Sequence, residues 1–308
     1  MLFRSWRELH WPPEDWLSTT LIDELSTSGR LLYPNVENVG SSTAHVTSPF
    51  LETYLERWYP DESPEKLDWH YESAQELIDL IWQNDGVPIL AHPLKELGLT
   101  GYHAVEVFSG YAHGIQPTWE PLMMDFWDDH LSDNPRLYGV AVNDWCGPVE
   151  EIVNYSCSEW DTGKTILLAD EFTVDSAKEA LLRGSMFAVA DLGEKDNYPT
   201  ISRIDQHSWG LSILTDGDVS WIHNGERFTS GNDAGNKRRQ QRRWHRFYTD
   251  GLDGYVRAEI TNGEDTVFTQ PWELSSLALA AVPEPSGSCL AWLAASLILL
   301  WRRVCPRS

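Results

Sequence analysis

The sequence predicts an α/β fold: a parallel sheet or barrel, then a small antiparallel β unit and a C-terminal transmembrane helix. From about residue 15 to residue 147, short apolar runs alternate with helical segments, which is typical of parallel strands joined by helices. After residue 150 the alternating segments are separated by Gly, Asn and Asp turns, which favours antiparallel strands. An apolar run near the end of the chain indicates the membrane helix.

The elements are predicted from local patterns. The last helix, 173–184, should be capped by Thr173 or Asp175 and should end at Gly184. Three earlier segments have apolar residues at helical spacing: 15–29, 63–86 and 119–132. Strands are expected at the apolar runs within 30–40, 42–50, 87–93, 102–110 and 136–144. The later alternating segments lie around "SWGLSILTDG", "DVSWIHNG" and "GYVRAEITNG".

Composition limits the partners of the chain. Lys and Arg number 23 against 47 Asp and Glu, and a formal charge of −24 disfavours nucleic acid and anionic membrane surfaces as partners. The basic run 236–246, "NKRRQQRRWHR", would suit nucleic acid in isolation, but in so acidic a chain we expect a solvated loop or hairpin edge. The four cysteines form no CxxC pair and leave the redox compartment undecided.

Four side chains stand out because each follows an apolar run. They are Glu37 in "YPNVEN", His45 in "STAHV", His92 in "ILAHP" and Asp144 in "GVAVND". Functional residues of α/β barrels gather at the C-terminal ends of strands, and imidazole with carboxylate suits zinc, manganese or iron. We therefore predict a divalent metal site. Glu106, within "YHAVEVF", is expected to be structural or to support a ligand residue.

The stretches "PNVEN", "AHV", "GVPILAHP", "YHAVEVFSG" and "YGVAVNDWCG" resemble the polymerase and histidinol phosphatase (PHP) superfamily, and within it the CehA/McbA-like metallohydrolases. The resemblance implies a distorted β/α barrel, incomplete here, with two or three metal ions and a phosphoester-like small substrate. Glu37 would bridge two metals, and His45 and His92 would be later ligands. Asp144 would bind a metal or orient the nucleophile, two roles that the sequence does not separate.

Two departures from the family pattern bear on activity. The opening His-x-His and the Asp-His pair are missing upstream of residue 30, so we expect an N-terminally truncated chain that lacks a complete metal centre. Cys146 stands where the family has histidine, and it is either a zinc ligand or a buried, inert cysteine. The alternative to a hydrolase is a non-catalytic exported binding or structural protein with a degenerate barrel.

The tail resembles a PEP-CTERM sorting signal. "VPEPSG" holds Pro283, Glu284 and Pro285, and the apolar run that follows ends at Arg302 and Arg303. The resemblance implies an exosortase-type membrane enzyme as partner and a membrane-associated, exported protein in the periplasm or on the surface of a bacterium. We accordingly predict three segments: a metallohydrolase domain at 1–150, a helix plus β-rich region at 151–276, and the sorting signal at 277–308.

Overall fold

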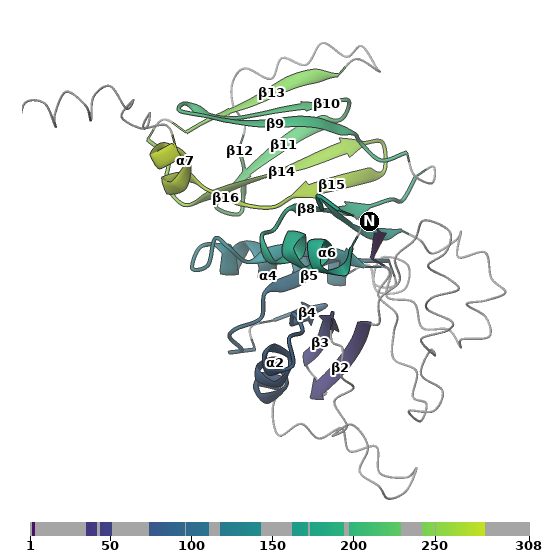
Figure 1. The fold of residues 1–308 in the computed structure, drawn as a ribbon. Helices are drawn as coiled ribbons and strands as arrows, with labels where there is room; N and C mark the ends of the chain where they lie inside the picture. The colour runs from purple at the N-terminus through teal and green to yellow at the C-terminus, as the bar shows by residue number, and fades with distance from the viewer. Residues whose placement is uncertain are drawn as a thin grey trace, which may run out of the picture.

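The computed structural model describes residues 2–3, 35–41, 44–50, 74–95, 97–110, 118–142, 162–171, 173–193, 197–228, 242–249 and 251–280. The predicted helix at 15–29 and the predicted transmembrane segment lie outside these residues, as do Asp144, Cys146 and the sorting-signal residues Pro283, Glu284, Pro285, Arg302 and Arg303. Among the helices that the structure does describe, none is long and apolar enough to cross a membrane. The described elements form a mixed α/β fold, with one sheet in the lower part of Figure 1 and two stacked sheets above it.

The lower sheet has five strands in the order β2-β3-β4-β5-β6. The last three run parallel, as predicted, but β2 and β3 form an antiparallel hairpin and β3 is antiparallel to β4. The prediction of an all-parallel arrangement was wrong here because only two residues separate β2 from β3, whereas a parallel crossover needs a dozen or more. The described strands form an open sheet rather than a closed barrel, and their bounds are Asn35–Ser41, Ala44–Pro49, Ile89–Ala91, Ala104–Ser109 and Tyr138–Val142.

Helices α2 (Ala74–Gln83), α4 (Trp119–Leu131) and α6 (Val174–Leu182) match the predicted helical segments. In α2, the buried residues Leu77, Ile78 and Ile81 recur at helical spacing and join the core of the lower sheet. In α6, Thr173 caps the helix by accepting a hydrogen bond from the backbone N–H of Ser176. Gly184 follows the helix with a φ of 67°, a left-handed conformation that glycine adopts without strain.

The upper part is a β-sandwich that is larger than the predicted small unit. One sheet runs β1-β7-β8-β15-β14-β11-β12, with β16 beside β14, and the other runs β13-β10-β9. Buried side chains of the second sheet, among them Leu211, Ile213 and Phe247, pack against those of the first. The strands are Leu2–Phe3 (β1), Gly163–Leu167 (β7), Met186–Ala190 (β8), Ile201–His207 (β9), Gly210–Thr215 (β10), Asp218–His223 (β11), Glu226–Phe228 (β12), Arg243–Tyr248 (β13), Tyr255–Asn262 (β14), Asp265–Thr269 (β15) and Trp272–Glu273 (β16), followed by helix α7 (Leu274–Ala280).

The lower sheet and the sandwich share buried contacts. Ala188 of β8 and Phe268 of β15 belong to the same apolar cluster as the interior of the lower sheet. The side-chain amide of Gln270 accepts a hydrogen bond from the Gly139 N–H and donates one to the Gly139 carbonyl, both at 2.8 Å. The three-stranded sheet lies on the side of the sandwich away from the lower sheet (Figure 1).

Candidate metal-binding site

Two of the predicted ligands meet at one edge of the lower sheet. His45 is the second residue of β3 and pairs in register with Ala91, the last residue of β4, after which His92 follows directly. Because β3 runs antiparallel to β4, the beginning of β3 lies beside the end of β4. His92 Nε2 lies 3.1 Å from His45 Nδ1, and the two rings meet edge to face.

Glu106 fixes the orientation of His92. Its carboxylate oxygen Oε2 accepts a hydrogen bond from the His92 backbone N–H at 2.9 Å and lies 3.0 Å from His92 Nδ1, and its side chain is 2% exposed. A carboxylate facing Nδ1 favours the tautomer with its proton on Nδ1, which leaves Nε2, the nitrogen nearer to His45, without a proton. The φ of His92 is 31°, an uncommon value for a residue with a side chain, and Glu106 stabilises it through the backbone bond.

Trp119 covers one side of the histidine pair. The indole of this first residue of α4 lies 5.8 Å from the His92 ring, centroid to centroid, at a tilt of 33°. The indole therefore lies beside the His92 ring, which is 10% exposed. The sequence analysis did not identify Trp119, because its position depends on how α4 packs against the sheet.

The other predicted site residues are placed only in part. The backbone of Glu37 on β2 pairs with Thr47 on β3, and Thr47 in turn pairs with Ile89 on β4. Glu37 therefore lies two residues along β2 from Val39, the residue that pairs with His45. That offset corresponds to about 7 Å along the strand, toward the beginning of β4. The Glu37 side chain, Asp144 and Cys146 lie outside the described residues, so their roles as ligands stay predictions.

The two nitrogens have the separation expected of neighbouring ligands on one ion. Imidazole nitrogens bind zinc at about 2.0–2.1 Å, so two of them at a tetrahedral angle lie about 3.3 Å apart. The observed 3.1 Å is close to this value. The Glu106 carboxylate contacts Nδ1, the other ring nitrogen of His92, as carboxylates commonly do for metal-bound histidines. Within the part of the chain that the structure describes, no group of three His, Cys, Asp or Glu could hold an ion. His45 and His92 are thus two nitrogens at a ligand-like separation, and their role as metal ligands stays a prediction.

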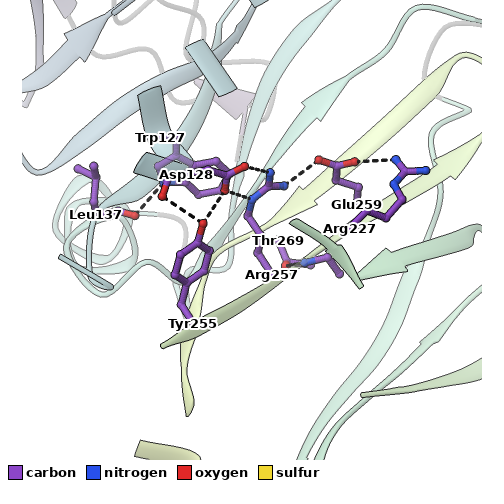
Figure 2. Close-up of polar contacts among 9 residues, drawn as sticks. Trp127, Asp128, Leu137, Arg227, Tyr255, Arg257, Glu259 and Thr269 are labelled. Atoms are coloured by element: carbon purple, nitrogen blue, oxygen red, sulfur yellow. Dashed lines mark hydrogen bonds and ion pairs between the residues drawn. The ribbon is translucent and has the colours of Figure 1, made fainter. Parts of the chain in front are cut away.

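A buried polar network holds α4, the helix that carries Trp119, against the sandwich (Figure 2). Asp128 of α4 accepts from Arg257 Nε at 2.8 Å, from Arg257 Nη2 at 2.6 Å and from the Tyr255 hydroxyl at 3.0 Å. Arg257 is 2% exposed, donates through Nη1 to Glu259 at 2.8 Å, and its guanidinium lies 5.0 Å from the centre of a Trp127 ring.

The surroundings shift the pKa values of Tyr255 and Arg257 in this network. Burial, reinforced by the Asp128 carboxylate, raises the pKa of the Tyr255 hydroxyl. Burial alone would lower the pKa of Arg257, but its bonds and charge interactions with Asp128 and Glu259 raise it overall. The guanidinium therefore stays charged and the phenol neutral, which suits a structural role that positions α4.

Comparisons with known proteins give one structural similarity. No family model matches the sequence, and a search of curated proteins finds no significant match. The chain is similar to a two-domain protein from Bacteroides vulgatus described as containing a predicted PHP-like metal-dependent phosphoesterase, with 15% identity, 86% of this chain and 84% of that chain covered, and a TM-score of 0.44. Because so low a TM-score does not establish a common fold, the proposals below rest on the residues of this chain.

Proposed function

We propose that the chain carries a metal-dependent hydrolase domain of the PHP type, close to the CehA/McbA-like branch, which acts on a phosphoester-like small substrate if the opening His-x-His and Asp-His motifs, absent upstream of residue 30, are supplied. The observation that carries the proposal is the pair of nitrogens His45 Nδ1 and His92 Nε2, 3.1 Å apart, with the Glu106 carboxylate on the opposite nitrogen of His92. Both histidines lie in the stretches of sequence that resemble the family. Two segments 47 residues apart thus supply neighbouring nitrogens at one sheet edge.

Each residue has a distinct task in this proposal. His45 and His92 would hold a zinc, manganese or iron ion, which when bound lowers the pKa of a water molecule and stabilises charge on phosphate oxygens. Glu106 keeps the proton of His92 on Nδ1 and thereby keeps Nε2 available as a donor to the ion. Trp119 lies beside the His92 ring. Asp144, which follows β6 in the chain, would bind the ion or orient the attacking water.

Metal binding by the purified full chain tests the proposal. We expect zinc or manganese to bind with measurable affinity in calorimetry, and we expect His92→Gln and His45→Gln each to weaken that binding strongly. A suitable control is His223→Gln, because His223 lies on β11 of the sandwich and its Nε2 bonds to the Asp253 carbonyl. If all three variants bind the metal as the unchanged chain does, the histidine pair is not the site.

Glu106→Gln gives a finer test of the same site. The amide keeps the shape of the side chain but loses the charge behind His92, and metal affinity should fall about 10- to 100-fold. Any hydrolysis of p-nitrophenyl phosphate or of a bis ester, measured with added manganese or zinc, should fall with it. A chain that holds no metal and hydrolyses neither ester would instead be the non-catalytic binding protein, and the hydrolase proposal would be rejected.

We also propose that the tail directs export and attachment. The supporting feature is the order Pro283-Glu284-Pro285, apolar run, Arg302-Arg303, which would present the motif beside the membrane to an exosortase-type enzyme and keep the arginines on the cytoplasmic side. Replacement of the three motif residues by alanine should leave the full-size chain in the membrane fraction of a bacterium that has an exosortase. Identical processing of both forms would contradict this.

A further inference from the structure

The outer face of the three-stranded sheet β13-β10-β9 is a second surface, distant from the histidine pair (Figure 1). Leu211, Ile213 and Phe247 point inward to the core of the sandwich. Side chains alternate along a strand, so the residues between them point outward. The register places three outward positions of β13, namely Trp244, Arg246 and Tyr248, opposite Leu214, Ser212 and Gly210 of β10.

Aromatic side chains gather on this outer face. Trp244 is 44% exposed and Tyr248 is 39% exposed, high values for such large side chains. In the turn between β9 and β10, Trp209 stacks on His207 with ring centres 4.3 Å apart and lies 5.1 Å from the Tyr248 ring. His207, Trp209, Trp244, Arg246 and Tyr248 are called the aromatic–arginine face below.

The same face carries positive charge. The Arg246 guanidinium lies 5.9 Å from the centre of a Trp209 ring, a cation–π arrangement that leaves its donors available to an anion. No carboxylate in the described part of the chain forms an ion pair with Arg246. Residues 237–246 hold six Lys and Arg of the 23 in the chain and no Asp or Glu. In a chain with a formal charge of −24, Arg246 places a positive group beside the planar rings of this face.

We propose that the aromatic–arginine face binds an acidic polysaccharide, a chain of sugar rings that carry carboxylate groups. Trp and Tyr offer large, rigid contact areas at low cost in conformational entropy, which suits the flat faces of sugar rings. Arg246 matches a carboxylate, because a guanidinium can donate two parallel hydrogen bonds to its two oxygens. This binding surface stands apart from the proposed hydrolase site and does not depend on it.

The neighbouring polar groups favour a carboxylated glycan over single-stranded DNA. Asp205, opposite Ser212 on the same face, is bound to Arg203 at 2.7 Å. A carboxylate at that position can accept hydrogen bonds from sugar hydroxyls, whereas the backbone of single-stranded DNA offers no hydroxyl donors.

Binding of the full chain to polygalacturonate, to neutral dextran and to poly(dT) tests the proposal. We expect binding to polygalacturonate that weakens as salt is added, and at least about tenfold weaker binding to dextran and to poly(dT). Trp244→Ala combined with Tyr248→Ala should reduce the affinity for polygalacturonate by about tenfold or more, because exposed aromatic anchors dominate such contacts. Arg246→Gln should reduce both the affinity and its salt dependence.

The matched control is Trp82→Ala. Trp82 is 40% exposed, close to the 44% of Trp244, but lies on α2 beside the lower sheet. It should leave polygalacturonate binding unchanged, and the thermal midpoint of each variant checks that it folds. Failure of the unchanged chain to bind polygalacturonate would overturn the proposal. So would binding to poly(dT) that is equal or tighter, or an equal loss in Trp82→Ala. Loss of metal binding in His92→Gln with glycan binding intact would confirm that the two surfaces act separately.

Discussion

The buried pair formed by Arg257 and Asp128 allows a quantitative prediction about stability. Asp128→Asn keeps the size of the side chain but removes the negative charge that faces a guanidinium only 2% exposed to solvent. Removing one partner of a buried pair costs about 3–5 kcal/mol, because the other charge stays buried. Glu259 still accepts from Arg257 at 2.8 Å, so the lower end of this range applies. We expect the free energy of unfolding to fall by about 3 kcal/mol, about a hundredfold in the equilibrium constant.

Urea unfolding at pH 7, followed by tryptophan fluorescence, measures this change. The control is Asp129→Asn, since Asp129 is the exposed neighbour on α4 and its loss changes the net charge equally. This control should lie within about 0.5 kcal/mol of the unchanged chain. Arg257→Met added to Asp128→Asn should restore most of the loss, because no buried charge is left without its partner. A cost below about 1 kcal/mol for Asp128→Asn alone would refute the reasoning.

Three further outcomes are expected. Burial lowers the pKa of His103, opposed in part by the Nε2–H bond to the Leu181 carbonyl, so the unfolded chain takes up this proton first as pH falls below about 6.5. Stability should decrease over that range, and the unfolding free energy of His103→Gln, measured from pH 7.5 to pH 5, should depend less on pH. Lys164→Met deprives the buried Asp191 of its ion-pair partner and should cost about 3–5 kcal/mol in urea unfolding, whereas a cost below about 1 kcal/mol would show that the pair is dispensable. Gly163→Ala would place a methyl group against the Val142 carbonyl oxygen and should lower the free energy of unfolding by about 3 kcal/mol. An unchanged thermal midpoint would contradict this expectation.

Local signals made part of the fold predictable. Thr173 and Gly184 mark both ends of α6 within a few residues, and the spacing of Leu77, Ile78 and Ile81 identifies α2. The hairpin of β2 and β3 was not predicted, because the strand in this region was placed too early and its two-residue connection was not recognised as a turn. The size of the sandwich also escaped prediction, because its pairings join strands far apart in the sequence.

The candidate site, like the fold, was predictable only in part from the sequence. His92 was predicted because it follows an apolar run that forms a strand. His45 was predicted on the same ground, although it lies at the beginning of β3 and not at its end. The contact of Glu106 with His92 follows from the pairing of β4 with β5, which no local pattern specifies. Asp128 and Arg257 are 129 residues apart. Asp128 is a charged residue in a predicted helix and Arg257 one in an alternating segment, so both look like surface positions.

The double hydrogen bond between the Gln270 amide and Gly139 has a consequence for how the chain comes apart. A side chain from the region after β15 completes the bonding of a strand residue in the lower sheet, so opening either layer leaves the other with unsatisfied buried groups. The two layers should therefore unfold as a single cooperative unit, with the amide proton of Gly139 among the last to exchange with solvent. A fragment that holds the sandwich alone would lose these two hydrogen bonds and expose Phe268 and Tyr255, which makes it prone to aggregate.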